Sequence, residues 1–338
     1  MNTWIVRCRP PTIAAASLTP YRRATRAQWL PRRRCLTTGR VLRRDGDPRV
    51  RPLGREISDD YATIRDTYDT PKYPIVLAHG LLGFSELHLS SFLPSVQYWH
   101  GIKEALTAQG ATVITPTVPP SSSIAERAAA LHAALAAEAP APEAVNIIAH
   151  SMGGLDARYM LAHLAPLPVR VASLVTVATP HRGSAFADHL LEEGGAAPIH
   201  LPRLYGAIER AGFGTAAFAQ LTRRYMQDEF NPATRDRPDV RYFSYGAAFV
   251  DLPPLLSPFR YPHGILAEAE GSNDGLVSVE SSRWGTYKGT LLGVSHLDLI
   301  NWSNRVGWTV REWMGVKRNF NAIAFYLDMA DMLAKEGL

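Results

Sequence analysis

Cysteine is nearly absent from this chain of 338 residues, since only Cys8 and Cys35 occur and none follows them. A disulfide framework therefore cannot hold the folded part together. Long apolar runs are missing too: no uncharged stretch reaches the ~18 residues that a membrane-spanning helix needs. The composition is otherwise ordinary, with 46% hydrophobic and 20% charged residues, which excludes a disordered or collagen-like chain.

Acidic residues are missing from the N-terminal segment. Residues 1–44 contain eleven arginines but no lysine, aspartate or glutamate, and Asp45 is the first acid. Arginines interrupt every apolar stretch that could serve as a secretory signal, so this composition is typical of a disordered mitochondrial transit peptide, with cleavage expected near Arg34 or Cys35. A basic tail that binds an acidic partner is the alternative. The net charge of +5 arises from this segment, and the rest of the chain has no excess of bases that would favour nucleic-acid binding.

The remainder of the chain has the pattern of an α/β protein. Residues 45–73 are charged and contain three prolines, and we interpret them as an exposed linker. From residue 74 onward short apolar runs alternate with helical patterns, which predicts one domain over 74–338 with a mostly parallel sheet covered by helices on both faces. The expected strands lie at 74–78, 112–118, 145–149, 169–177 and 240–245, and helices are expected at 96–109, after the capping box Ser123–Glu126, at 152–164 and within 298–338.

Ser151 is the candidate nucleophile. It lies in the sequence AHSMGG (149–154), directly after an expected buried strand and before a helix. A nucleophilic serine needs a sharp strand-to-helix turn that exposes its oxygen, and small residues on both sides let the flanking backbones approach closely. Ala149 stands where glycine is usual, and Gly153 fills the second small position. A serine that only caps the helix is the alternative, but the strand–serine–helix context favours a nucleophile.

A serine hydrolase also needs backbone N–H groups that stabilise the developing oxyanion. One of them belongs to the residue after the nucleophile, here Met152. The second is expected in the loop after an early strand, where HGLLG (79–83) lies, and we assign it to Leu81. The glycines of this loop allow its backbone to turn N–H groups inward. A plain strand–helix turn is the alternative interpretation.

The acid and the base should follow the serine in that order. The Asn-Asp-Gly loop at 273–275 supplies Asp274, and the one histidine after it is His296. We therefore predict that His296 is the base, and that Asp274 orients its imidazole and stabilises the imidazolium. A simple turn is the alternative for this loop. Asp298 is the rival acid, but it lies two residues from His296 and should point away from it in most geometries.

Several motifs together resemble a known family. In this order the chain contains HGLLG, AHSMGG, ATPHRGSAFAD (178–188), NDGLVSV (273–279) and HLDLIN (296–301), which is similar to the order in bacterial calcium-dependent true lipases. With the basic leader, the chain most resembles the fungal mitochondrial triacylglycerol lipases. The resemblance covers roughly residues 79–301 and implies an α/β-hydrolase fold, ester hydrolysis through an acyl-enzyme, and a mobile lid.

The resemblance also implies a structural calcium ion, although the chemistry itself requires no cofactor. The ligands in relatives correspond to Asp298 and, more approximately, to Asp251, and backbone carbonyls could complete the shell. The alternative for Asp298 is that it caps the following helix. Two departures are visible: Met152 replaces a glutamine common in relatives, and no cysteine lies near the acid loop, where bacterial relatives often have a disulfide. The second departure suits a reducing compartment.

A Gly-interrupted amphipathic insertion at about 187–235 is the expected lid. Its apolar residues could cover an acyl-chain site; they are Phe213, Phe218, Leu221, Tyr225 and Phe230. The spacing of Phe218, Leu221 and Tyr225 predicts that these three lie on one face of a helix. A fixed cap helix is the alternative. We interpret His181 and Arg182 as members of a hydrogen-bonded loop that shapes the pocket, and His150 as structural.

These observations favour a serine carboxylester hydrolase, with a triacylglycerol lipase as the first hypothesis. A phospholipase, an acyl thioesterase or an acyltransferase would use the same triad. A catalytically silent binding module is a different class, and the intact Ser151, Asp274 and His296 argue against it. The expected partner is acylglycerol at a lipid surface, with peripheral contact to a membrane or lipid droplet and no transmembrane segment.

The leader makes the first testable prediction. Residues 1–44 fused to a fluorescent reporter should direct the reporter to mitochondria, because they combine eleven arginines with no acid. Fluorescence microscopy checks this. A reporter that remains in the cytosol or is secreted would contradict the assignment.

Overall fold

The structure is a computed structural model that describes residues 53–81, 86–87, 96–138, 141–192, 215–255, 257–302 and 320–338. The expected transit peptide, residues 1–44, lies outside the described residues. None of the described helices is long and apolar enough to cross a membrane.

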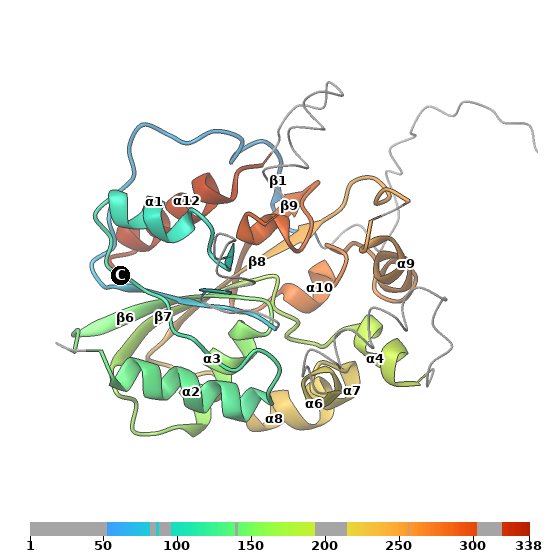
Figure 1. The fold of residues 1–338 in the computed structure, drawn as a ribbon, viewed down its shortest axis with the longest axis horizontal. Coiled ribbons are helices and arrows are strands. Elements are labelled where there is room, and N and C mark those ends of the chain that lie inside the picture. The colour runs from blue at the N-terminus through green and yellow to red at the C-terminus, as the bar shows by residue number, and fades with distance from the viewer. Residues whose placement is uncertain are drawn as a thin grey trace, which may run out of the picture. The chain divides into compact units, whose positions relative to one another are not determined.

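A seven-stranded sheet in which all neighbouring strands are parallel forms the centre of the domain (Figure 1). Its order is β1-β9-β8-β7-β6-β2-β5. The strands are β1 (Glu56–Ile57), β2 (Ile75–Ala78), β5 (Val113–Ile114), β6 (Ala144–His150), β7 (Arg170–Val177), β8 (Arg241–Ala248) and β9 (Thr286–Leu292). A separate antiparallel pair joins β3 (Glu86–Leu87) to β4 (Val96–Gln97). The predicted α/β fold with a parallel sheet is thus confirmed.

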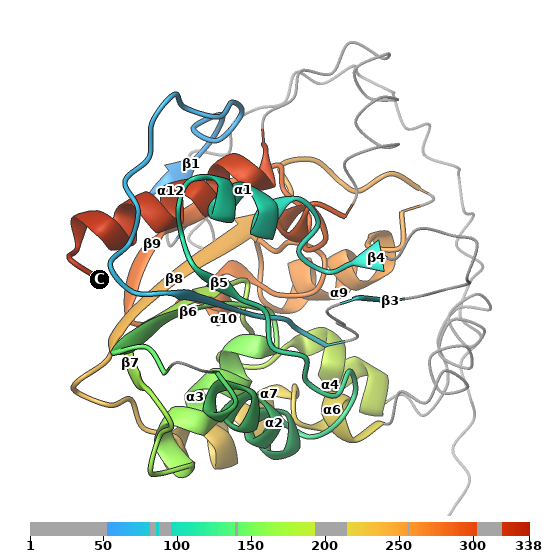
Figure 2. The same ribbon diagram turned by 60° about the vertical axis from the view of Figure 1, so that its left-hand side comes forward.

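Helices cover both faces of this sheet, as the two views show (Figures 1 and 2). On one face lie α1 (Ile102–Ala108) and α12 (Ala322–Lys335), which contact each other. The other face carries α2 (Ile124–Ala136) and α3 (Gly153–His163). The predicted capping box starts α2, because the Ser123 and Glu126 side chains each bond to the other's backbone N–H. Two buried apolar clusters fill the layers, and each contains residues from β2, β6 and β7.

The remaining helices lie among the loops after the strands. They are α4 (Ala185–Glu192), α6 (Thr215–Ala219), α7 (Arg223–Tyr225), the π-helix η1 (Met226–Phe230), α8 (Asn231–Ala233), α9 (Arg260–Ala269), α10 (Val279–Ser282) and the 3-10 helix η2 (Asp298–Ile300). The helix expected at 96–109 is shorter than predicted. It begins after Gly101, whose φ of 74° is left-handed, and β4 occupies the preceding segment.

The described part of the expected linker, residues 53–73, belongs to the domain instead. β1 pairs with β9, and Ile57 and Tyr61 are buried in the apolar core. Arg65 forms ion pairs with Asp328 and Asp331 of α12 at 2.7 and 3.0 Å. The linker interpretation failed because a two-residue strand has no periodicity, and because charges that resembled a solvated segment pair with a helix distant in sequence.

The insertion at 187–235 differs from the predicted lid helix. Phe213 lies outside the described residues. α6 ends at Ala219, the N–H of Leu221 donates to the carbonyl of Phe218, and the Thr222 side chain caps α7. The prediction that Phe218, Leu221 and Tyr225 share one helical face is therefore wrong, because a turn interrupts the helix.

A buried arginine fixes the end of the insertion to the sheet domain. Arg158 of α3 stacks on Trp284, with 3.7 Å between the guanidinium carbon and the ring centroid. Its NH groups donate to the side-chain oxygen of Asn231 at 3.0 Å and to the carbonyl of Thr234 at 3.1 Å. These contacts of Arg158 favour a fixed cap at residues 226–234 over a mobile one.

Candidate active site

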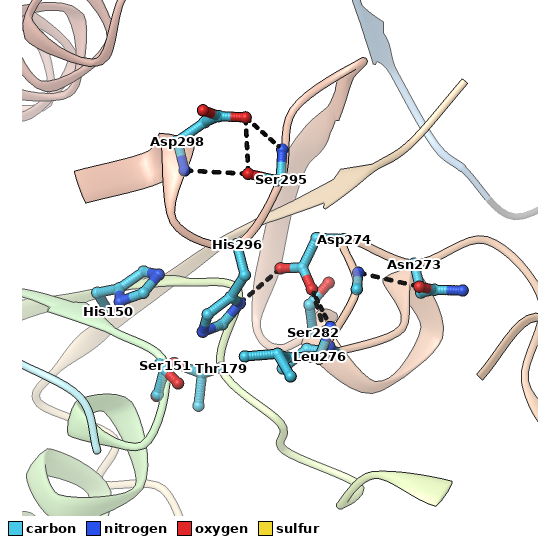
Figure 3. Close-up of polar contacts among 12 residues, drawn as sticks. His150, Ser151, Thr179, Asn273, Asp274, Leu276, Ser282, Ser295, His296 and Asp298 are labelled. Atoms are coloured by element: carbon cyan, nitrogen blue, oxygen red, sulfur yellow. Dashed lines mark hydrogen bonds and ion pairs between the residues drawn. The ribbon is translucent and has the colours of Figure 1, made fainter. Parts of the chain in front are cut away.

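Ser151 directly follows β6, at the carboxyl edge of the sheet, and has a left-handed backbone. Its φ is 55°, a conformation that non-glycine residues seldom adopt. Two hydrogen bonds hold it there: the Ser151 N–H donates to the carbonyl of Val177 at 2.9 Å, and the Thr179 hydroxyl donates to the Ser151 carbonyl at 2.7 Å. Since α3 begins at Gly153, the chain reverses at Ser151, and the Ser151 side chain lies near the ring of His296 (Figure 3).

The turn is tight enough to require glycine after it. A Cβ at Gly153 would lie 2.6 Å from the carbonyl oxygen of Ala78 and 2.7 Å from that of His79. Both neighbours are backbone atoms, which cannot rotate away. This explains the small residue expected two positions after the serine.

The predicted acid and base meet beside this serine. Nδ1 of His296 lies 2.7 Å from Oδ2 of Asp274, and both side chains are buried. The other carboxylate oxygen of Asp274 accepts the N–H groups of Leu276 and Val277 at 3.0 and 2.8 Å. These bonds fix the carboxylate, so that it orients the ring of His296. Figure 3 shows His296 between Asp274 and Ser151.

Asp298, the rival acid, bonds to Ser295. Its Oδ2 accepts the backbone N–H of Ser295 at 3.0 Å and the Ser295 hydroxyl at 2.7 Å. η2 begins after Leu297 and has no side-chain cap bond, so Asp298 does not act as the cap of this helix. Asp251 is exposed, and no group of three or more His, Cys, Asp or Glu side chains that could hold a metal occurs in the described ranges. The calcium site at Asp298 and Asp251 therefore gains no support from the donor set and stays a prediction.

The described part of the HGLLG loop, residues 79–81, packs against the serine. A Cβ at Gly80 would lie 2.7 Å from the Cβ of Ser151. Leu81 follows Gly80 and packs against the buried cluster that contains Met152. Within the described part of the chain, the backbone N–H groups of Leu81 and Met152 donate to no other residue. Two N–H groups without acceptors, on both sides of a serine, are what oxyanion stabilisation requires.

Buried polar side chains hold this loop. The N–H of Val118 donates to Nε2 of His79 at 3.2 Å, so Nδ1 carries the proton and donates to the carbonyl of Gly80 at 3.0 Å. Burial lowers the pKa of His79 to about 4, which keeps its ring neutral. Arg127 donates to the carbonyl of His79 at 2.8 Å and forms a buried ion pair with Asp156 at 2.8 Å.

His181 and Arg182 belong to a hydrogen-bonded loop, which agrees with their interpretation from the sequence. Nε2 of His181 lies 3.0 Å from the Thr176 hydroxyl, and the ring stacks on Trp284. Burial is the main reason that the pKa of His181 lies well below its ordinary value. Arg182 donates to the carbonyls of Glu280 and Arg283. This loop joins the insertion to the segment after the acid.

Sequence reasoning missed Tyr98, whose hydroxyl accepts the N–H of Gly80 at 3.0 Å and lies 2.7 Å from Nδ1 of His150. It also missed Arg158 and Trp284. Tyr98 is a single tyrosine in a segment predicted as a helix, and no sequence pattern assigns it to a site. Arg158 and Trp284 are 126 positions apart, so their stacking leaves no signal in the local sequence.

Comparison with known proteins identifies the class. A family model described as "alpha/beta hydrolase fold" matches residues 73–239. The chain is similar to Triacylglycerol lipase 2 of Saccharomyces cerevisiae, with 36% identity over 83% of this chain and 97% of the yeast protein. It is also similar to a triacylglycerol lipase of Pseudomonas fragi, with 29% identity over 79% of this chain and 98% of that protein.

Solved structures agree on the fold. A metagenomic carboxyl esterase has a TM-score of 0.58 at 21% identity, covering 84% of this chain and 80% of the esterase. The lipase of Staphylococcus hyicus has a TM-score of 0.55 at 19% identity, covering 81% of this chain and 98% of that lipase.

The fold and the similarity to the named lipases define an α/β hydrolase of the serine type. Within this class, the chain belongs to the family of the yeast and bacterial triacylglycerol lipases to which it is similar over most of its length.

The close approach at Gly153 makes a prediction about stability. Gly153→Ala should lower the free energy of unfolding by about 3 kcal/mol or more, because its Cβ meets two backbone carbonyls. Gly264→Ala in α9 is the matched control: a Cβ there meets nothing within 4 Å, so this helix substitution should stabilise by roughly 0.5–1 kcal/mol. Urea unfolding measures both values. Equal stability of the two variants would refute the packing argument.

Proposed function

We propose that this chain is a triacylglycerol lipase in which Ser151, His296 and Asp274 act as nucleophile, base and acid. The observation that carries the proposal is the left-handed Ser151 beside the buried His296–Asp274 pair. The yeast and bacterial relatives, which are named triacylglycerol lipases, support the choice of substrate.

The proposed reaction follows from these contacts. The Ser151 oxygen attacks the ester carbonyl carbon while Nε2 of His296 takes its proton, and Asp274 stabilises the resulting imidazolium through Nδ1. The N–H groups of Leu81 and Met152 stabilise the oxyanion, each worth ~2.7–4 kcal/mol. His296 then returns the proton to the departing glycerol oxygen. Water, activated by the same histidine, releases the fatty acid from the acyl-enzyme.

An exposed apolar loop beside the acid supports action at a lipid surface. Val250, Leu252 and Leu255 are 68%, 67% and 82% exposed, and all three lie between β8 and α9. This loop, residues 249–259, is attached to the acid loop: the N–H of Phe249 donates to the carbonyl of Asn273 at 2.9 Å, and Phe259 contacts Gly275. Burial of such side chains in lipid yields roughly 1.5–3 kcal/mol each. We infer that the loop contacts the substrate aggregate.

We also propose a mitochondrial location and a cover over the site. The basic, acid-free residues 1–44 support a mitochondrial location. Described residues of the insertion lie over the site: Ala217, Met226 and Phe230 pack with Met152 in one buried cluster. Arg158 holds Asn231 and Thr234, at the end of this cover, in place.

The triad makes a graded prediction. Ser151→Ala should lower kcat for a short soluble ester by about 10⁴- to 10⁶-fold without unfolding the chain, because it removes the attacking atom. Asp274→Asn should lower it by about 10⁴-fold, since His296 loses the carboxylate that orients it. Asp298→Asn, whose carboxylate accepts from Ser295, should have a much smaller effect. Steady-state kinetics with purified variants decides this, and a larger loss in Asp298→Asn would reassign the acid.

The apolar loop makes a separate prediction. The rate should rise as tributyrin passes its solubility limit, and Leu252→Ser with Leu255→Ser should weaken binding to triolein emulsion by at least about tenfold, because two exposed leucines no longer enter the lipid. Hydrolysis of p-nitrophenyl acetate reports whether the site is intact. Ile64→Ser is the matched control, since Ile64 is also exposed but lies in the segment beside α12. Equal emulsion binding of the loop variant and the control would contradict the assignment.

A further inference from the structure

Tyr98 connects the loop that carries the oxyanion donor Leu81 with His150, the neighbour of His296. Its hydroxyl oxygen accepts the backbone N–H of Gly80 at 3.0 Å and lies 2.7 Å from Nδ1 of His150. All three groups are buried, and none of them takes part in the reaction steps above. We propose that Tyr98 and His150 form a positioning pair that holds the oxyanion loop and His296 in fixed positions relative to each other. This inference rests on the proposed function.

The protons of the pair can be assigned. A backbone N–H can only donate, so the Tyr98 oxygen accepts from Gly80 and its single proton is directed to Nδ1 of His150. His150 then carries its own proton on Nε2. Burial, and after it the nearby charge of His296, lowers the pKa of His150 well below its ordinary value, so the ring is neutral.

His150 packs against the proposed base. The ring centroids of His150 and His296 are 4.5 Å apart at an interplanar angle of 45°, and Figure 3 shows the rings as neighbours. Nε2 of His150 is buried and lies near the backbone of His296, without meeting the geometry of a full hydrogen bond within the described residues. A neutral ring at this position supports His296 sterically and does not oppose the positive charge that His296 acquires during the reaction.

At the other end, Tyr98 sets the peptide that precedes the oxyanion donor. The carbonyl of Gly80 accepts from His79, and in a trans peptide the N–H of Leu81 points in the opposite direction. Tyr98 holds the N–H on the other side of Gly80. With both sides of Gly80 fixed, and no room for a side chain next to Ser151, the direction of the Leu81 N–H is determined.

Removal of one hydroxyl tests the pair. Tyr98→Phe leaves the N–H of Gly80 and Nδ1 of His150 without partners, so kcat for p-nitrophenyl butyrate should fall about 10- to 100-fold. This is less than the 10²–10³-fold loss on removal of an oxyanion donor itself. KM should stay within about twofold of the parent value. The inhibition constant of butylboronic acid, whose adduct with the serine resembles the tetrahedral intermediate, should rise in parallel with the fall in kcat.

Tyr326→Phe is the matched control. Tyr326 is buried in the same aromatic cluster, since Trp99 contacts both tyrosines, but its hydroxyl has no hydrogen-bond partner among the described residues. This variant should keep kcat within about twofold of the parent. An equal loss in both variants would indicate disturbed packing and overturn the proposal.

Substitutions of His150 test the other partner, including the case in which Tyr98→Phe does not fold. His150→Asn can place its side-chain oxygen near the Nδ1 position and accept from Tyr98, whereas His150→Leu fills similar space without an acceptor. The Asn variant should therefore keep a higher kcat than the Leu variant. A Leu variant as active as the Asn variant would overturn the proposal.

Ser151→Ala distinguishes a failure of the positioning pair from a failure of the proposed function. If Ser151→Ala is inactive while Tyr98→Phe keeps the parent kcat, the positioning pair is wrong and the proposed function stands. If Ser151→Ala keeps its activity, the proposed function itself fails.

Discussion

The left-handed backbone at Ser151 is the constraint on which the site depends. A non-glycine residue with φ of 55° is strained by roughly 1–3 kcal/mol, and it persists only where its surroundings hold it. Here the Val177 carbonyl and the Thr179 hydroxyl supply the hydrogen bonds. Gly80 and Gly153 allow residues 78–80 to approach the serine turn within contact distance. The strain is therefore offset by close packing, and that packing also brings Leu81 beside the serine.

The parallel sheet explains why distant segments meet at this point. Each strand delivers its following loop to the same carboxyl edge. Hydrogen bonds then connect the loops: the Ser184 hydroxyl donates to the carbonyl of Leu276, and the N–H of Ala185 donates to the Glu270 side chain at 2.5 Å. The acid loop is thus connected to the start of α4 and, through the bond from Phe249 to Asn273, to the apolar loop at 249–259.

The candidate site could be predicted from the sequence because its chemistry restricts residue types at fixed places along the chain. Ser151, Asp274 and His296 follow from a strand–turn–helix context, from chain order and from elimination, and the structure brings the acid and the base within hydrogen-bond distance. The fold followed from apolar runs such as 145–149. The rest depends on tertiary contacts: β1 is too short for periodicity, the turn after Ala219 interrupts an apparently continuous face, and Tyr98 acquires its role only where Gly80 and His150 converge.

The central claim is that Ser151 is the nucleophile and that the buried His296–Asp274 pair activates it. Reaction with a fluorophosphonate probe, followed by mass spectrometry of the peptides, tests this most directly, because the probe phosphonylates only an activated serine. We predict one adduct, on Ser151, and a rate of labelling that falls by orders of magnitude in Asp274→Asn. An adduct on another serine, or equal labelling of the Asp274→Asn variant, would contradict it.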